Sequence, residues 1–356
     1  MEKSDFLSVL SSYRNLLWPV IEIYLKKTSH FTGAGKIDQK YQPLIDFHSQ
    51  MVSDYPQRKG KYLRPSLLML TAQAMGVSLE KTLHTAAAMQ LSEDWILNHD
   101  DIEDSSLQRR GRPTLHRIYG LELAINAGDA LHALTWHVLN DNILTLGPSQ
   151  TEKINDEFFS IINRTILGQT IEIKWTKENK NDLTEDDIYL ILESKTGYYT
   201  ISGPMRLGAI LAKATPDQLE SIYRFGLYLG RSFQIIDDLL DLTSDFSGQK
   251  KQKGNDVYEG KKTLIIIHLL HHIDSKNKEE LLRILSLSRS QKKASDIKWV
   301  IQKMAEFGSL DYAKTKAQEF AKKASQIFDT ELLFLSTEPY RSQLRSAIEF
   351  IINRQH

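Results

Sequence analysis

Two acidic clusters, far apart in the chain, have residue types and a spacing suited to binding a divalent metal. Both follow the pattern D-D-x-x-D, at residues 100–104 and 237–241. On a helix the first and last aspartates of this pattern lie about one turn apart on one face, where like charges destabilise the helix. Mg²⁺ binds one or two carboxylates and completes its octahedral shell with water and phosphate oxygens. One such cluster alone could equally be a solvated helix face, but both lie in apolar surroundings, and together they predict these metal ligands: Asp100, Asp101, Asp104, Asp237, Asp238 and Asp241.

Basic residues near these clusters could bind an anion. Arg109 and Arg110 follow the first cluster closely, and Lys61 and Arg64 precede the apolar segment 66–75. Pro65 fits the first turn of a helix there, whose amide groups point at whatever the two cations bind. The alternative, a basic turn that only caps a helix, remains open.

Two further lysine-containing segments admit two interpretations each. Lys195 lies inside an apolar helical pattern at 188–211, where a lysine commonly extends its ammonium outward. The Gly/Lys-rich stretch 244–262 directly follows the second acidic cluster. It is either a solvated loop or a segment that closes over phosphate groups.

The composition is that of an ordinary globular chain with no general affinity for polyanions. The 356 residues are 41% hydrophobic and 25% charged, and 45 basic residues balance 45 acidic ones. Nucleic acid is therefore not an expected partner. The chain has no cysteine, its first residues do not resemble a signal peptide, and no stretch approaches the roughly 18 apolar residues of a membrane span. We expect a cytoplasmic protein without membrane insertion.

Helical periodicity runs through nearly the whole chain. Apolar residues recur at helical spacing in segments that include 5–27, 41–53, 79–98, 188–211 and 219–242, and no strand-like alternation or domain linker is evident. The sequence predicts one all-helical domain over residues 1–356.

The motifs together resemble the trans-isoprenyl diphosphate synthases, also called polyprenyl synthetases, over roughly residues 40–265. The matching motifs in order are G-K-x-x-R-P at 60–65, the first D-D-x-x-D with R-R-G at 109–111, G-Q at 168–169, K-T at 195–196, F-Q-x-x-D-D-x-x-D at 233–241 and E-G-K-x-T at 259–263. The resemblance implies a large antiparallel helical bundle around a central cavity, usually a homodimer.

The resemblance also implies an activity and residue roles. A short-chain enzyme of this kind condenses isopentenyl diphosphate with an allylic diphosphate, with three Mg²⁺ ions bound by the acidic clusters. Asp100, Asp237, Lys195 and Thr196 would be catalytic. The allylic diphosphate would contact Arg109, Gln169, Lys195, Thr196, Gln234, Lys261 and either Lys251 or Lys253, and isopentenyl diphosphate would contact Lys61, Arg64, Arg110 and the residue at position 93.

Product length is predicted from the residues that precede the first acidic cluster. At about 1.5 Å per residue, Ile96 lies about 6 Å and Trp95 about 7.5 Å before Asp100 along a helix. Bulky side chains at these positions limit family members to short products, so we expect farnesyl (C15) or, preferably, geranylgeranyl (C20) diphosphate. Alternatively, Trp95 is ordinary core packing.

One departure from the family pattern leaves alternatives open. Glu93 stands where the family usually has His or Gln, and a carboxylate there should repel a phosphate. Either Glu93 pairs with Lys61 or Arg64, or it is protonated, or the subsite is weakened. Glu93 also favours a competing hypothesis, a non-catalytic isoprenoid-binding or regulatory subunit. Terpene cyclases share the first cluster but lack a second D-D-x-x-D.

Overall fold

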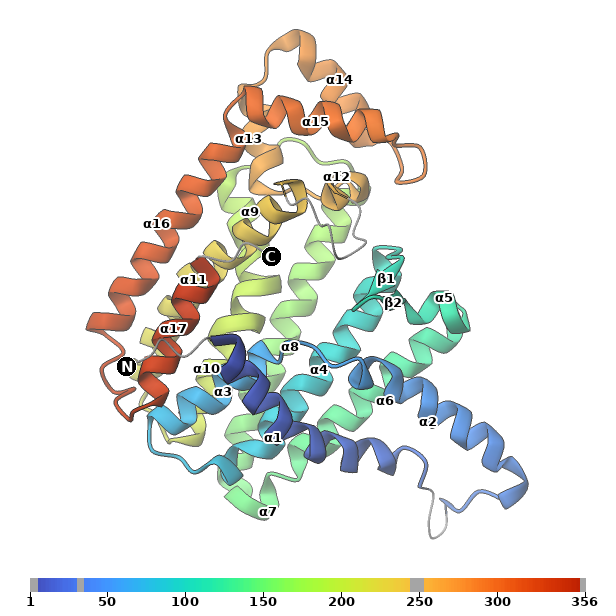
Figure 1. Cartoon of the computed structure of the whole chain (residues 1–356), viewed down its shortest axis with the longest axis vertical. Helices are drawn as coiled ribbons and strands as arrows, with labels where there is room; N and C mark the ends of the chain where they lie inside the picture. Colours follow the sequence, from blue (N-terminus) through green and yellow to red (C-terminus); the bar gives the residue numbers. More distant parts are fainter. Residues whose placement is uncertain (1–5, 31–34, 244–252, 353–356) are drawn as a thin grey trace. The chain divides into compact units, whose positions relative to one another are not determined.

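The chain packs as two compact units, each assembled from segments that are separated in the sequence. Figure 1 labels the helices and strands described below. The computed structural model describes residues 6–30, 35–243 and 253–352. The first unit comprises Met1–Glu157, Leu207–Ala214 and Leu335–Leu344, and the second comprises Phe158–Arg206, Thr215–Phe334 and Arg345–His356.

The first unit is built from helices and contains one very short hairpin. Its elements are α1 (Phe6–Lys27), η2 (Gln39–Tyr41), α2 (Gln42–Gln57), α3 (Leu63–Ala74), η3 (Leu79–Thr82), α4 (Leu83–Glu103), β1 (Gln108–Arg109), β2 (Arg112–Pro113), α5 (Leu115–Tyr119), α6 (Leu121–Asn140) and α7 (Ile143–Leu146). Late in the chain, Ser336 and Thr337 return to this unit, where their backbone N–H groups donate to the carbonyl of Ala74 at 3.0 and 2.9 Å.

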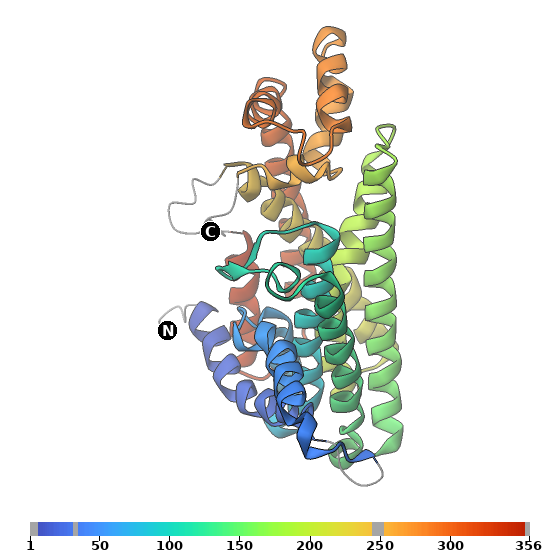
Figure 2. The same cartoon turned by 90° about the vertical axis from the view of Figure 1, so that its right-hand side faces the viewer.

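The second unit is also helical. Its elements are α9 (Glu185–Ile191), η4 (Leu192–Ser202), α11 (Pro216–Thr243), α12 (Asn255–Glu259), α13 (Leu264–His272), α14 (Ser275–Ser286), α15 (Ala294–Glu306) and α16 (Ser309–Thr330). Three helices have residues in both units: α8 (Pro148–Lys177), α10 (Gly203–Leu211) and α17 (Tyr340–Ile352). Figure 2 shows α8 as a long unbroken helix.

Helix α4 is buried along most of its length, which explains its weak apolar periodicity. Small residues such as Ala86, Ala87 and Ala88 are fully buried and allow neighbouring helices to approach closely. At the α6 contact, a Cβ added to Gly128 would lie 2.2 Å from Nε2 of His99, so a larger residue there would displace the imidazole. Helix α4 ends at Glu103, directly after most of the first acidic cluster.

Helices η4 and α11 cross at a pair of glycines. A Cβ on Gly230 would lie 2.3 Å from Cα of Gly197, so α11 needs glycine at the crossing, whereas a Cβ on Gly197 would lie 3.7 Å from Cα of Gly230, an ordinary contact. Segment η4 is π-helical over 11 residues, a rare geometry that is frequent at functional sites. Glu193, near the start of η4, forms an ion pair with Arg231 of α11. Its Oε2 also lies 3.8 Å from Nη2 of Arg164 on α8.

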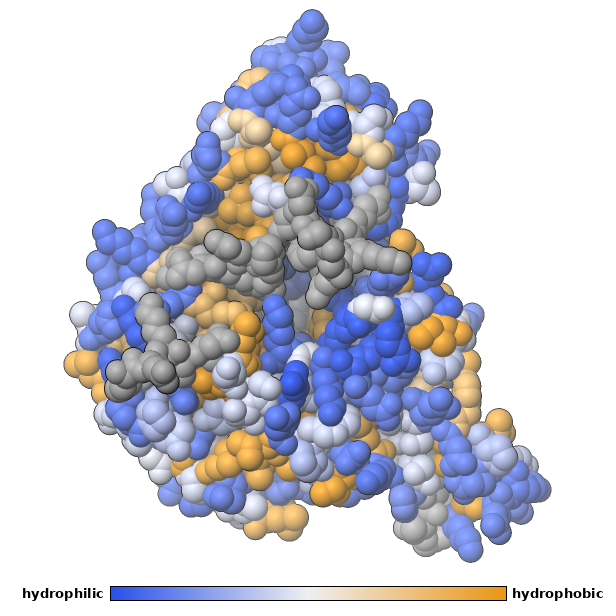
Figure 3. Space-filling view, in the orientation of Figure 1, coloured by the Kyte–Doolittle hydropathy of each residue, from blue (hydrophilic) through white to orange (hydrophobic). Residues whose placement is uncertain are grey.

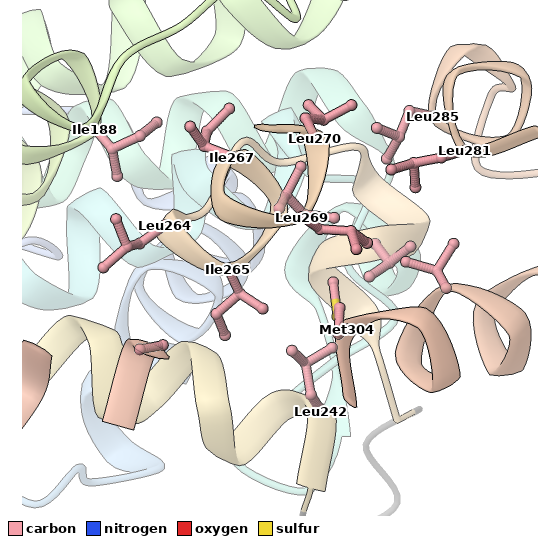
Figure 4. Close-up of a cluster of buried hydrophobic side chains, with 14 of the residues drawn as sticks. Ile188, Leu242, Leu264, Ile265, Ile267, Leu269, Leu270, Leu281, Leu285 and Met304 are labelled. Carbon is pink, nitrogen blue, oxygen red and sulfur yellow. The ribbon is translucent and has the colours of Figure 1, made fainter. Parts of the chain in front are cut away.

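The apolar core of the second unit surrounds α13. Six of the nine residues of α13 are buried apolar side chains, and they pack among leucines, isoleucines and a methionine of neighbouring helices (Figure 4). Thr263 begins this helix and accepts a hydrogen bond from the amide of Ile266. The apolar residues of α13 are buried, whereas His271 and His272 at its end are exposed.

The all-helical prediction is confirmed. Among the described residues, strand occurs only in the two-residue β1 and β2, paired antiparallel. No helix in the described part of the chain combines the length and apolarity needed to cross a membrane. Hydrophilic residues dominate the face in Figure 3, interrupted by small apolar patches. Whether the two units act as one domain over residues 1–356 stays a prediction.

Candidate functional site

The first acidic cluster lies at the carboxyl-terminal end of α4, and its three aspartates differ in environment. Asp100 and Asp104 are partly exposed, whereas Asp101 is fully buried. The amide of Asp104 donates to the carbonyl of Asp100 at 2.9 Å and closes the last turn. The helix therefore presents two of the three carboxylates to solvent.

Both carboxylate oxygens of Asp101 accept hydrogen bonds from neighbouring side chains. The Tyr55 hydroxyl donates to Asp101 at 2.6 Å, and Nε and Nη2 of Arg109 donate at 3.0 and 2.5 Å. Burial alone would lower the pKa of Arg109, but its hydrogen bonds and charge interaction with Asp101 outweigh burial and raise it. In this arrangement Asp101 orients Arg109, and its role as a metal ligand stays a prediction.

The two arginines after the cluster lie on a tight hairpin held by α2. Arg110 and Gly111, at the turn, have φ angles of 51° and 75°. The guanidinium of Arg58 donates to the carbonyls of Arg109 and Pro113 at 3.0 and 2.8 Å, and its Nε donates to Asp54 at 2.6 Å. The hairpin backbone is thus fixed by a side chain from another helix.

The second group of cations in this unit is paired with carboxylates. Nη1 of Arg64 lies 3.2 Å from Oε2 of Glu93, and Nη2 of Arg110 lies 3.6 Å from Oε1 of Glu93. Nη1 of Arg110 also donates to Asp94 at 2.8 Å. Burial raises the pKa of Asp94 to about 6, although the charge of Arg110 opposes this shift. Of the alternatives stated for Glu93, its pairing with Arg64 is confirmed.

The segment that contains Lys61 has a backbone shaped around Arg110. A Cβ on Gly60 would lie 2.7 Å from Nη2 of Arg110, so a larger residue there would shift the guanidinium. Lys59 and Tyr62 have positive φ angles of 47° and 61°, which are uncommon for residues other than glycine. The turn before α3 is therefore specialised and differs from an ordinary helix cap.

In the second unit, the second acidic cluster belongs to a larger group of carboxylates. Asp237 is exposed, Asp241 is partly exposed and Asp238 is buried. Burial raises the pKa of Asp238 to about 7, Gln234 opposes the shift through its hydrogen bond, and the charges of Asp237, Glu172 and Asp241 add to it. Carboxylates crowded in this way favour a bound cation.

A hydrogen-bond chain links Asp238 to the π-helical segment. Nε2 of Gln234 donates to Asp238 at 2.8 Å, and Oε1 of Gln234 accepts from the Thr196 hydroxyl at 2.9 Å. Since the Thr196 proton is donated to Gln234, the remaining lone pairs of Oγ1 are free to face a cationic centre.

Lys195 is held by an acidic partner and does not extend into solvent. Its Nζ lies 2.5 Å from Oε2 of Glu172, and both side chains are largely buried. A Cβ on Gly168 would lie 2.7 Å from the backbone nitrogen of Lys195, which explains the glycine of the G-Q motif as a close approach of α8 to η4. Gln169 follows on α8.

Helix α12 connects the second cluster to Lys261. The amide of Asp256 donates to a carboxylate oxygen of Asp241 at 3.0 Å, and Lys261 lies 2.6 Å from Glu259. Burial raises the pKa of the Asp256 carboxyl, and Lys261 opposes this rise. Lys251 lies outside the described residues, whereas Lys253 lies within them and is exposed.

Within the described ranges, no three carboxylate or imidazole groups already converge on a point where a metal could sit. Asp100, Asp104 and Asp241 are partly exposed and Asp237 is exposed. Their carboxylate oxygens are nevertheless the ligands that Mg²⁺ prefers.

A family model described as polyprenyl synthetase matches residues 46–304, well over half of the chain. The chain belongs to the polyprenyl synthetase family. A geranylgeranyl diphosphate synthase from Sulfolobus acidocaldarius is 34% identical over 270 residues, which cover 74% of this chain and 78% of the relative. The predicted family and the predicted prenyltransferase activity are thereby confirmed.

Solved structures agree with this assignment. A geranylgeranyl pyrophosphate synthetase from Pyrococcus horikoshii matches with a TM-score of 0.83 and 26% identity, covering 98% of each chain. A geranylgeranyl pyrophosphate synthase from Corynebacterium glutamicum, complexed with isoprenyl diphosphate and magnesium, matches with a TM-score of 0.82 over 99% of this chain and 100% of its own. At 21% identity, the second match supports the fold alone.

The two residues predicted to limit product length in this polyprenyl synthetase are both at least partly buried. Trp95 is 7% exposed and stacks on His132 of α6 with ring centroids 4.2 Å apart, and Nε1 of Trp136 donates to Nε2 of His132 at 2.9 Å. Ile96 is half-buried. The stack fixes the orientation of the Trp95 indole, and whether that ring limits product length stays a prediction.

Several residues that shape the site have no signal in the family motifs. Arg58 and Asp54 form an i,i+4 pair, which is a common surface pattern, and Asp94 resembles any polar residue on α4. Nη1 of Arg289 donates a hydrogen bond to Glu259 at 3.0 Å. Nζ of Lys292 donates to the carbonyls of Val257 and Tyr258 at 2.8 and 3.1 Å. Only the three-dimensional contacts reveal these roles.

Proposed function

We propose that this polyprenyl synthetase is a short-chain enzyme that condenses isopentenyl diphosphate with an allylic diphosphate to form geranylgeranyl or farnesyl diphosphate. The observation that supports it best lies in the second unit, where Asp237, Asp238, Asp241 and Glu172 crowd together beside Lys195. Such a group of carboxylates with an adjacent ammonium suits magnesium and a diphosphate anion.

Magnesium is the cofactor that the available ligands fit. In this proposal Asp100, Asp104, Asp237 and Asp241 hold the ions, three per site by family resemblance. Bound Mg²⁺ neutralises the charge that develops on a diphosphate leaving group as its C–O bond breaks.

Cationic side chains of the chain itself would bind and orient the substrates. Arg109, oriented by Asp101, and Lys195 and Lys261 would contact the allylic diphosphate, with Gln169, Gln234 and a lysine of the 251–253 segment nearby. Lys61, Arg64 and Arg110 would contact the diphosphate of isopentenyl diphosphate. At an effective dielectric constant near 20, one opposite charge at about 4 Å contributes on the order of 4 kcal/mol, so several cations substantially stabilise the departing anion.

Thr196 would stabilise the allylic cation. Its hydroxyl proton is donated to Gln234, so Oγ1 can direct electron density toward a positive carbon. The double bond of isopentenyl diphosphate then attacks that carbon, and a proton is lost to the released diphosphate. No His or Ser base is needed. His99, packed against α6 beside Gly128, accordingly has a structural position.

We further propose that the enzyme is a cytoplasmic homodimer. Helix α6 exposes large apolar side chains at Leu121, Leu123 and Ile125, which are 49%, 37% and 40% exposed. Exposed apolar residues on one helix are suited to contact a second copy of the chain.

The alternative of a non-catalytic subunit is not favoured, because the chain belongs to an enzyme family and retains both acidic clusters. The test is incubation of the purified chain with Mg²⁺, labelled isopentenyl diphosphate and, separately, the C5, C10 and C15 allylic diphosphates. We expect C15 or C20 products after dephosphorylation and chromatography. Asp237→Asn is the matched loss-of-function control. No incorporation with any primer by a folded protein would refute the proposal.

A further inference from the structure

We propose that Glu93 determines the affinity of the subsite predicted for isopentenyl diphosphate, by occupying the arginines that would bind the diphosphate. We call this group the Glu93 subsite; its residues are Lys61, Arg64, Glu93, Asp94 and Arg110. All five belong to the first unit. The identity of the ligand rests on the proposed function, whereas competition between Glu93 and an anion does not.

The contacts show that Glu93 bridges two arginines. One carboxylate oxygen lies 3.2 Å from Nη1 of Arg64 and the other lies 3.6 Å from Nη2 of Arg110. The three side chains are only 12–21% exposed. Water therefore screens these charges poorly. An anion that binds here must compete with the Glu93 carboxylate for the same two arginines.

Asp94 holds the opposite edge of Arg110 and has a different role. Nη1 of Arg110 donates to Asp94 at 2.8 Å and to the carbonyl of Tyr55 at 3.0 Å, while Gln90 donates to Asp94 at 3.2 Å. Asp94 is 1% exposed, so no ligand can reach it. Asp94 anchors Arg110, and Glu93 faces the edge that remains.

The edge of the Arg110 guanidinium that faces Glu93 lies among buried polar atoms without hydrogen-bond partners. Within the described part of the chain, Nη2 of Arg110, Oη of Tyr62 and Oε2 of Glu93 are buried atoms with no hydrogen-bond partner. Buried donors without partners are costly, and a carboxylate 3.6 Å away does not satisfy the guanidinium. Phosphate oxygens offer several strong acceptors and suit both the guanidinium and the tyrosine hydroxyl.

The carboxylates of the Glu93 subsite offset positive charge that a diphosphate would need. Glu93 and Asp94 offset the positive charges of Arg64 and Arg110, the two arginines that they contact. A diphosphate must then either displace Glu93 from the arginines or bind beside its negative charge. Both routes weaken binding, and both weaken it more for pyrophosphate than for the less charged inorganic phosphate.

The first test measures anion binding without catalysis. The full chain, in the absence of Mg²⁺, is titrated with inorganic pyrophosphate and separately with inorganic phosphate by calorimetry. We expect Glu93→Gln to lower the Kd for pyrophosphate at least about tenfold, equivalent to about 1.4 kcal/mol, and to lower the Kd for phosphate less. Glu152→Gln, which removes one exposed charge elsewhere in the first unit, should change neither Kd.

A second background assigns the effect to this subsite. In the Arg64→Gln chain, Glu93→Gln should lose most of its gain, because one of the two competing cations is gone. Glu93→Ala provides a second variant in case the glutamine chain folds poorly. Unchanged or weaker pyrophosphate binding by either folded Glu93 variant would overturn the inference.

Steady-state kinetics separate this inference from the proposed function. With Mg²⁺ and an allylic primer, Glu93→Gln should lower KM for isopentenyl diphosphate at least about tenfold while kcat and KM for the primer stay within about twofold. Tighter pyrophosphate binding without any prenyl product would refute the proposed function and leave the competition by Glu93 intact. Prenyl product with an unchanged KM for isopentenyl diphosphate would refute the inference and leave the function intact.

Discussion

Replacing Asp101 by asparagine tests whether this aspartate orients Arg109 or binds metal. The substitution keeps the size of the side chain and removes its charge. Asp101 is fully buried and accepts hydrogen bonds from Tyr55 and from two nitrogens of Arg109. If these contacts are its role, Asp101→Asn destabilises the chain even when no metal is present.

The expected loss of unfolding free energy follows from the partners of Asp101 that lose their interaction with its charge. Removing one partner of a buried ion pair costs about 3–5 kcal/mol, because the other charge stays buried. Arg109 retains Asp100 at 3.5 Å as a weaker partner, which places the expected loss near the lower limit, about 3 kcal/mol. Tyr55→Phe removes a single hydrogen bond to a charged group and should cost about 1.5–3 kcal/mol.

The assay is urea denaturation of the metal-free chain, followed by circular dichroism. Tyr55→Phe, Asp101→Asn and the double variant form a mutant cycle, and we expect the double variant to lose clearly less than the sum of the singles. An Asp101→Asn chain within about 1 kcal/mol of wild type, but with a strongly raised Mg²⁺ requirement for activity, would refute the orienting role and restore the metal-ligand prediction.

Three more predictions concern buried groups. Because burial raises the pKa of Asp94 from 3.8 to about 6, the native state holds a proton that the unfolded state has lost between these values. Stability relative to Asp94→Asn should therefore fall by about 2 kcal/mol from pH 4 to 7 in urea denaturation. Gly230→Ala forces a Cβ within 2.3 Å of Gly197 and should cost about 1–3 kcal/mol by thermal unfolding, whereas Gly35→Ala, with open space around it, should be near neutral. Burial lowers the pKa of Lys292 to about 8, so the unfolded state binds more protons than the native state between pH 8 and 10.5. The unfolding free energy of the wild type should therefore rise relative to that of Lys292→Met over this range. A difference in unfolding free energy that does not change with pH would contradict this reasoning.

The helices were predictable because their amphipathic or buried patterns are local. The predicted helix at 219–242 corresponds to α11 (Pro216–Thr243), and the helix at 5–27 corresponds to α1 (Phe6–Lys27). The π-helical geometry of η4 was not predictable. Its residues have the pattern of an ordinary helix, and the altered winding accompanies tertiary contacts with α8 and α11.

The site was predictable in its residue types but only partly in their roles. The two D-D-x-x-D motifs identify six aspartates, yet their pattern does not distinguish Asp100 from Asp101. That distinction depends on Tyr55 and on a hairpin that brings Arg109 back onto the helix. Likewise, Glu93 was recognised as a departure, but Asp94, which anchors Arg110, is visible only from its contact.

The return of the chain at Ser336 and Thr337 to the carbonyl of Ala74 has a consequence for how the protein forms during synthesis. The first unit includes Leu335–Leu344, and the second unit includes residues on both sides of that segment. A ribosome must therefore release the chain beyond residue 335 before either unit has all of these parts. Contacts between such distant residues close large loops and form late. A growing chain that stops before residue 335 exposes the unfinished edge at Ala74, where chaperones would bind and proteases would cut.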